Sequence, residues 1–465
     1  MTEFSQKCRF YLQESGSNVY QIARTANLDR TTVQRMLTGK RLPSQEFVTT
    51  FCNHLRINSI ERHDLIESYK MEKIGKSTYM NRKYIQNLIE HIVETQSKPD
   101  YFLTLSTSLL PTDSTVKKVL TKEFERDDKG KIFTNIPPSH NYIYRILTEL
   151  HLQYKKSVPV QHMFSMYPNP LSIPNSSVNL EKLYYIVPFL FSDYSNYQPC
   201  YFYSRNLKSD YSTQLFPYYL ITSSEVTIFS SDLKHCIIHS DEKTKALYNE
   251  TFLHMREQAH PLMVKHSDPL QALSFYLKSL NTTRFPTHSI ESQPCVFAFL
   301  PIPEKIARLC PDSVGQKADL LAMIEGSYQS FDDHIGSIKN ICTTDGFRSF
   351  YKDGILHGAF TIFSEPFSEK ERKEMIHHFR TLYMEHDSFY FLNDSFKIPN
   401  DLQIELYDKN QVNIVSTQNN NFNFLGFTES SICDAFYDFA ESLCESEMLC
   451  PVPRVLETLD ELLKV

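Results

Sequence analysis

The chain has 465 residues, enough for about two to four domains of ordinary size. Apolar residues make up 41% of the chain and charged residues 22%, a composition typical of a globular protein with a large core. Only 11 residues are glycine, whereas glycine makes up about 7% of an average protein. Because sites that hold phosphate groups on bare backbone need clustered glycines, this scarcity argues against the Rossmann, P-loop and kinase classes.

Cysteines and apolar stretches indicate a cytoplasmic protein. The ten cysteines are scattered and form no CxxC pair, so we expect reduced thiols. The first residues, MTEFSQKCRF, lack the apolar segment of a secretion signal. The longest apolar stretch, residues 184–191, is interrupted by a proline and is far shorter than the about 20 residues that cross a bilayer. No membrane partner is therefore expected.

Charge is distributed unevenly along the chain. Residues 1–80 contain 12 lysines and arginines against 8 acidic residues, whereas the remainder contains 36 against 47. A basic N-terminal region on an acidic body suggests that the N-terminal region meets a polyanion.

Residues 1–70 show five short helical patterns, which predict an all-α domain. Asn18 and Asp29 are residue types that cap helix starts, and they precede the second and third patterns. Gly39 can end the third helix, and Pro43 with Ser44 opens the fourth. The helices are expected at residues 3–15, 19–25, 30–37, 44–55 and 60–69.

The second and third helices match a helix-turn-helix. A small residue, Ala23, is available where the two helices would touch, and Asn27 tolerates the positive φ that a tight turn needs. Leu28, Val33 and Met36 fall on the inward side of the third helix. Four polar residues, of types that reach base edges in a DNA major groove, remain on its outward side: Arg30, Thr31, Gln34 and Arg35.

The string VYQIARTANLDRTTVQRMLTGKRLPS resembles the helix-turn-helix of the Cro/phage-repressor (Xre-like) family. The resemblance covers residues 3–70 only. Asn27 replaces the glycine that is common in the family's turn, and Val19 stands where a phosphate-binding glutamine is common. The resemblance implies base contacts and phosphate contacts on double-stranded DNA. The implied base-contacting residues are Arg30, Thr31, Gln34 and Arg35, and those assigned to phosphate are Asn18, Thr38, Lys40 and Arg41.

Residues 71–96 are expected to link this domain to the body. The segment 71–83 looks like a connection, and an apolar stripe from Tyr84 to Val93 predicts a helix. Gly75-Lys76-Ser77 is similar to the end of a Walker motif, but the remaining glycine and the preceding strand are missing.

The body, residues 97–465, shows a mixed pattern that predicts an α+β or α/β fold. Asn/Pro/Ser clusters at 168–177 and 281–293 suggest an internal boundary, giving regions 97–280 and 281–465. Ser368 and Glu371 form a capping box before one helix, and helical stripes are expected at 432–443 and 455–463. Strands are expected at 218–221, 226–229, 236–238, 295–300, 389–392, 402–406 and 412–415.

No local enzyme signature is present. The chain lacks GxSxG, HExxH and GxGxxG motifs. His235, Cys236 and His239 are close in sequence, but Cys236 would lie on the opposite face of a strand from the two histidines. We therefore expect no enzyme activity, catalytic residue, metal or cofactor.

The sequence predicts a DNA-binding transcription regulator. A single domain of this size makes few DNA contacts, so a homodimer on two half-sites is expected. The large body would serve dimerisation or the sensing of a small-molecule or peptide effector. Two alternatives stay open: a DNA-tethered enzyme, and a protein-interaction module of a defence or mobile-element system.

Overall fold

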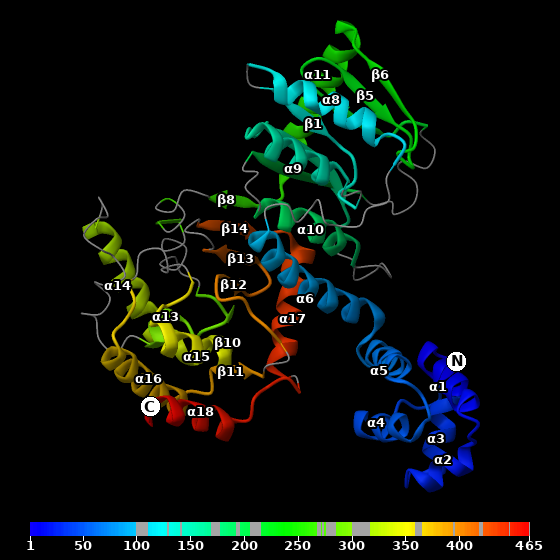
Figure 1. Cartoon of the computed structure of the whole chain (residues 1–465), viewed down its shortest axis with the longest axis vertical. Helices are drawn as coiled ribbons and strands as arrows, with labels where there is room; N and C mark the ends of the chain where they lie inside the picture. The colour runs from blue at the N-terminus through cyan, green and yellow to red at the C-terminus, as the bar shows by residue number, and fades with distance from the viewer. Residues whose placement is uncertain are drawn as a thin grey trace. The chain divides into compact units, whose positions relative to one another are not determined.

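The computed structural model describes most of the chain and divides it into two compact units, Met1–Lys83 and Tyr84–Val465 (Figure 1). We call the first unit the head and the second the body. The described residues are 1–98, 110–127, 130–139, 142–168, 177–191, 196–204, 215–266, 271, 274–275, 285–299, 317–358, 365–393, 396–417, 422–445 and 447–464.

The head is all-α, as the sequence predicts. Its described helices share one core in which Phe4, Val33, Phe51 and Leu65 are almost fully buried. The helices are α1 (Glu3–Glu14), α2 (Val19–Thr25), α3 (Arg30–Leu37), α4 (Gln45–His54), α5 (Ser59–Ile74) and the start of α6 (Lys76–Ser97). The segment 71–83, expected as a connection, is helical on both sides of Gly75, whose φ of +88° separates α5 from α6.

The body begins with a seven-stranded mixed sheet, which we call sheet A. Its order is β6-β5-β4-β1-β2-β3-β7, with β1, β2 and β3 parallel and the remaining pairs antiparallel. The strands are β1 (Ile132–Thr134), β2 (Val160–Met166), β3 (Tyr197–Tyr203), β4 (Tyr218–Ile221), β5 (Val226–Phe229), β6 (Cys236–His239) and β7 (His260–Pro261).

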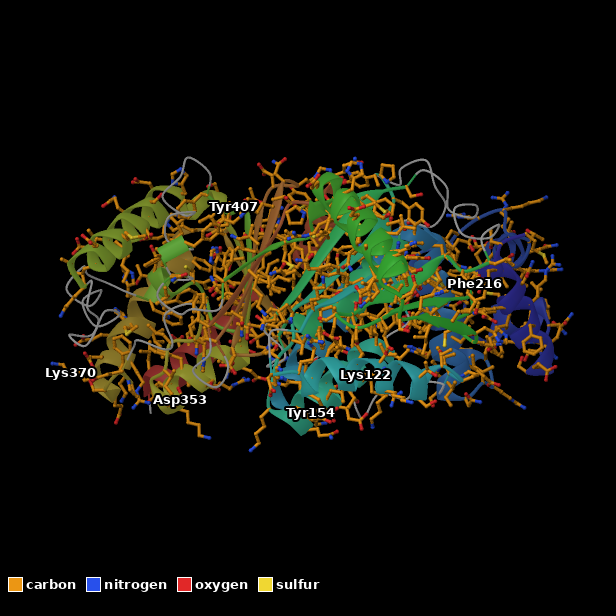
Figure 2. The ribbon with its side chains drawn as sticks, turned by 90° about the horizontal axis from the view of Figure 1, so that it is seen from above. Lys122, Tyr154, Phe216, Asp353, Lys370 and Tyr407 are labelled. Carbon is orange, nitrogen blue, oxygen red and sulfur yellow. The ribbon has the colours of Figure 1, made fainter. Side chains whose placement is uncertain are left out.

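Helices cover both faces of sheet A. On one side lie α8 (Asp113–Glu125), α9 (Tyr142–Tyr154) and α10 (Ser177–Leu190). Figure 2 shows Lys122 on α8 and Tyr154 at the end of α9, and the Tyr154 hydroxyl donates to Glu125 of α8 over 2.9 Å. The opposite face is covered by α11 (Glu242–Gln258), whose Phe252 stacks on Phe133 of β1 with ring centroids 4.6 Å apart.

The second half of the body contains another seven-stranded mixed sheet, sheet B. Its order is β11-β10-β9-β12-β13-β14-β8, with β9, β10 and β11 parallel and the remaining pairs antiparallel. The strands are β8 (Val264–His266), β9 (His288–Glu291), β10 (Lys339–Thr343), β11 (Phe389–Leu392), β12 (Leu402–Tyr407), β13 (Gln411–Ser416) and β14 (Asn423–Phe427). The helices are α13 (Val296–Phe299), α14 (Lys317–His334), α15 (Thr344–Asp353), α16 (Glu369–Glu385), α17 (Ser430–Cys444) and α18 (Val452–Lys464), with a short 3₁₀ helix at Ile335–Ser337.

The two halves of the body have the same topology. Each has three parallel strands joined by helical crossovers, then three antiparallel strands, then a helix, which is α11 in the first half and α17 in the second. Each helix is followed by a segment that pairs antiparallel with the third strand, through Cys200↔Pro261 and Leu392↔Leu449. The body is therefore an internal structural repeat, in which residues 132–261 correspond in topology to residues 288–449.

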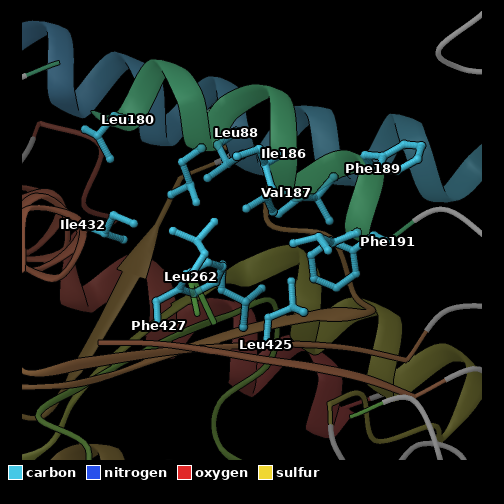
Figure 3. Close-up of a cluster of buried hydrophobic side chains, with 14 of the residues drawn as sticks. Leu88, Leu180, Ile186, Val187, Phe189, Phe191, Leu262, Leu425, Phe427 and Ile432 are labelled. Carbon is cyan, nitrogen blue, oxygen red and sulfur yellow. The ribbon is translucent and has the colours of Figure 1, made fainter. Parts of the chain in front are cut away.

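One apolar core joins the halves. Figure 3 shows side chains of α6 and α10 meeting those of β14 and α17, among them Leu88, Val187, Phe427 and Ile432. Two polar contacts cross the same junction: Asn179 of α10 donates to the Ser431 hydroxyl over 2.9 Å, and Tyr203 of β3 donates to Glu429 over 2.9 Å. The halves therefore pack as one unit.

The body is a mixed α and β fold, and most of its predicted strands form. The exception among them is the strand expected at 295–300, which is wrong because Val296–Phe299 forms the helix α13. The capping box of Ser368 and Glu371 is present at the start of α16. In the described part of the chain, no helix combines the length and apolar character needed to cross a bilayer.

Candidate nucleic-acid interface

The turn between α2 and α3 has the conformation that the sequence predicts. Asn27 adopts φ +53°, and the Leu28 N–H donates to the Ala23 carbonyl over 2.9 Å. Asp29 caps α3 by accepting from the Thr32 N–H over 3.0 Å. Val33 and Met36 are buried in the head core. These contacts fix which side of α3 lies inside.

The C-terminus of α3 is fixed by a Schellman motif. The Gly39 N–H donates to Met36 and the Lys40 N–H to Arg35, over 3.0 and 2.9 Å. Gly39 has φ +69°, and a Cβ atom there would lie 3.2 Å from the Ser5 hydroxyl. Glycine therefore suits both the backbone conformation and the close approach to α1.

The outward side of α3 carries the four predicted base-contacting residues. The described ion pairs of the head join Lys7 to Glu3 and Asp64, and Lys70 to Glu67, so none of them engages α3. Residues four apart lie on one side of a helix, which groups these side chains in two adjacent rows. The rows, both exposed, are Arg30 with Gln34 and Thr31 with Arg35.

The predicted phosphate-contacting residues lie at the helix ends. Lys40 and Arg41 are exposed. The Thr38 hydroxyl donates to the Gln34 carbonyl over 3.0 Å, so it caps α3. The Asn18 oxygen accepts from the Gln21 N–H over 3.0 Å, which leaves only its amide NH₂ group for a phosphate.

Tyr20 is a candidate contact that the sequence analysis did not assign. It is the second residue of α2, two positions after the cap Asn18, and is 58% exposed. A phenol hydroxyl at a helix N-terminus can donate to a phosphate oxygen. The signal available in the sequence was a large hydroxyl-bearing residue two positions after the helix cap.

Titratable groups of the first half of the body form a structural cluster. His162 of β2 is fully buried, and its Nε2 donates to the Ile136 carbonyl over 2.6 Å. Its Nδ1 therefore accepts from the Tyr197 hydroxyl over 2.7 Å, and that hydroxyl also contacts Tyr144. Burial lowers the pKa of His162 to about 4, so the ring is neutral and supports the fold.

A second buried cluster lies on the face of sheet B that the crossover helices cover. Glu291 accepts from the Ser289 hydroxyl over 2.5 Å, and Glu405 accepts from Gln403 and Tyr407 over 3.0 and 3.1 Å. Beside Ser289 and Glu405 lies a cavity of about 20 Å³, which is the size of one water molecule. Burial, with a smaller contribution from the Glu405 charge, raises the pKa of Glu291 to about 8.

Replacing Glu291 should change how stability depends on pH. Its pKa is higher in the folded chain than in the unfolded chain, so its contribution is complete below the ordinary glutamate range and is lost as pH rises through about 8. We expect the unfolding temperature to fall between pH 5 and pH 9, and to fall less in Glu291→Gln. Thermal unfolding at both pH values measures this. Glu242→Gln, at an exposed glutamate, is the control and should behave as wild type. An equal fall in unfolding temperature between pH 5 and pH 9 for all three proteins would contradict the prediction.

Other candidate groups do not assemble into a site. Among the described residues, no group of three or more His, Cys, Asp or Glu side chains is placed to hold a metal ion. This includes His235, Cys236 and His239 around β6. In the described head, the exposed polar side of α3 is where the predicted base-contacting residues lie together.

No protein-family model matches the chain, and neither a curated protein nor a solved structure matches it.

Proposed function

We propose that the protein is a sequence-specific DNA-binding transcription regulator, in which α3 of the head enters the major groove. The observation that carries the proposal is the outward side of α3, where Arg30, Gln34 and Arg35 are exposed on a helix whose opposite side is fixed in the core. An α-helix with its side chains is about 10–12 Å in diameter, which fits the width of the major groove, about 12 Å.

The ends of α3 support the same proposal. Lys40 and Arg41 follow α3 after Thr38 and Gly39, where cations can pair with the DNA backbone on one side of the groove. Tyr20 and the Asn18 amide lie at the start of α2, where they can contact the DNA backbone on the other side of the groove. Phosphate contacts on both flanks hold a recognition helix in register.

The body can bring two heads together, which a single small head cannot do. One head makes few base contacts, so useful specificity requires two heads on neighbouring half-sites. The body is acidic as a whole and would be repelled by the DNA backbone, which leaves the heads as the DNA-contacting parts. We propose that the body dimerises the protein and senses a small-molecule or peptide effector.

Selection of bound duplexes from a random pool tests the function. The full chain should enrich one sequence motif with two related halves. The triple variant Arg30→Ala/Gln34→Ala/Arg35→Ala should enrich none, while its helical content and unfolding temperature match wild type. If the chain enriches no DNA sequence but retains a protein partner, the result would support the protein-interaction module. Metal-dependent cleavage of the pool would support the DNA-tethered enzyme.

A further inference from the structure

The two sheets of the body differ at one equivalent edge. In sheet B, β14 is the last of the three consecutive antiparallel strands. It pairs with β8, which follows the first half of the body directly in the chain. The equivalent strand in sheet A is β6, which pairs with β5 on its inner side. Within the part of the chain that the structure describes, no strand pairs with the outer side of β6.

The outer edge of β6 offers hydrogen-bonding groups. The Ser230 N–H donates to the His235 carbonyl over 3.0 Å, so these two residues form a hydrogen-bonded pair across the β5–β6 hairpin. Because such pairs alternate along antiparallel strands, Ile237 and His239 bond toward β5. The N–H and C=O groups of Cys236 and Ile238 are therefore directed outward.

β6 itself exposes two apolar side chains. Ile237 and Ile238 are 43% and 45% exposed, although both lie in the middle of a strand. Unpaired edges of this kind normally carry charges that prevent association, and β6 carries none of the lysines used for that purpose.

We propose that β6 is the dimerisation strand of this protein, pairing antiparallel with β6 of a second copy so that sheet A continues across a two-fold axis. The choice of a second copy as the occupant rests on the proposed function, which requires two heads in one particle. The pairing of β14 with β8 gives independent support, because it shows that the same edge of this fold accepts an antiparallel strand.

The two-fold axis fixes the register. If Cys236 of one copy lies opposite Ile238 of the other, all four outward backbone groups of each strand find partners across the axis. Ile237 then lies directly opposite its own counterpart, in a pair that is not hydrogen-bonded and in which side chains are closest. Opposite charges at this position should therefore attract, and like charges should repel.

Charge substitution at Ile237 tests the proposal on the full chain without DNA. We expect the wild type to elute with twice the mass of the chain at micromolar concentration, measured by light scattering. Ile237→Lys and Ile237→Asp should each elute with the mass of one chain, and an equimolar mixture of the two should recover the dimer mass. Recovery in the mixture cannot come from misfolded protein. Met384→Lys, an exposed apolar residue on α16, is the control and should remain dimeric.

Several outcomes would overturn the dimer strand. One is a wild type that elutes with the mass of one chain. This includes the case in which another segment of the same chain covers β6, which would protect the β6 amides from hydrogen exchange in the monomer. Another is a dimer that both charge variants retain. The proposed function fails separately, if a dimeric wild type enriches no DNA sequence in the selection.

Discussion

Gly346→Ala should destabilise the body more than any other glycine substitution in the described residues. A Cβ atom at this position would lie 1.9 Å from the carbonyl oxygen of Ser292 and 2.4 Å from its carbonyl carbon. Both are backbone atoms at the end of β9, so no side chain can rotate away. The two segments must separate by more than an ångström to restore ordinary contact.

The contact at Gly346 also holds a hydrogen-bonded corner. The Ser292 carbonyl accepts from both the N–H and the hydroxyl of Thr343, over 3.1 and 3.0 Å. The same hydroxyl caps α15 by accepting from the Gly346 N–H over 3.2 Å. Displacing β9 therefore costs these bonds as well as packing, and we expect a loss of about 3 kcal/mol or more in the free energy of unfolding.

Thermal unfolding followed by circular dichroism measures this loss. For a unit the size of the body, about 2 °C is lost per kcal/mol, so the transition should fall by about 6 °C or more. Gly336→Ala is the matched control, because its new Cβ would meet only the His386 ring at 3.8 Å. That control should unfold within about 1 °C of wild type. An unchanged transition for Gly346→Ala would show that β9 can shift freely.

The head could be predicted from the sequence because its signals are local. Asn18, Asp29 and Gly39 each act on backbone groups within four residues, and all three act as expected. The inward positions Val33 and Met36 followed from helical periodicity and are buried. The exposed side of α3 was therefore predictable as the remainder of the same helix.

Most strands of the body that were predicted lie next to tight turns, and the parallel strand β11, an aromatic-rich run, is the exception. β4 and β5 flank Ser223-Ser224, and β12 and β13 flank Asp408–Asn410, where Asp408 has φ +52°. Parallel strands such as β2 and β10 have no such turn, because helical crossovers connect them. Apolar runs as short as 295–300 fit a strand and a buried helix equally well, and here the described part became α13.

The repeat could not be predicted because equivalent strands carry different residues. On the crossover side, β1 has Ile132 and Thr134 where β9 has Ser289 and Glu291. β9 reads HSIE, a polar string that gives no strand signal although all four residues are buried. Ser289 donates to Glu291 within the strand, and His288 contacts Glu441 of α17 over 3.1 Å. A hydropathy pattern does not reveal such contacts. The open edge of β6 was equally hidden, because it is defined only by comparison with β14.

Arg35→Ala should separate base contact from backbone contact. If Arg35 reaches a base edge, its removal should weaken binding to the selected operator by about 1–3 kcal/mol, or roughly 5-fold to 150-fold, and weaken binding to random DNA much less. Lys40→Ala should weaken both DNAs by a similar factor. It should also reduce the slope of log K against log salt by about one per head, because one phosphate contact is lost.

Titrations of wild type and both variants against operator and random duplexes, at several salt concentrations, measure these differences. Arg9→Ala, an exposed arginine on α1, controls for the loss of one positive charge from the head and should reproduce neither pattern. Equal losses on both DNAs for Arg35→Ala would place its guanidinium on the phosphate backbone. The base contacts would then have to come from Arg30, Thr31 and Gln34, the first of which lies at the N-terminal end of α3 where a recognition helix meets the groove.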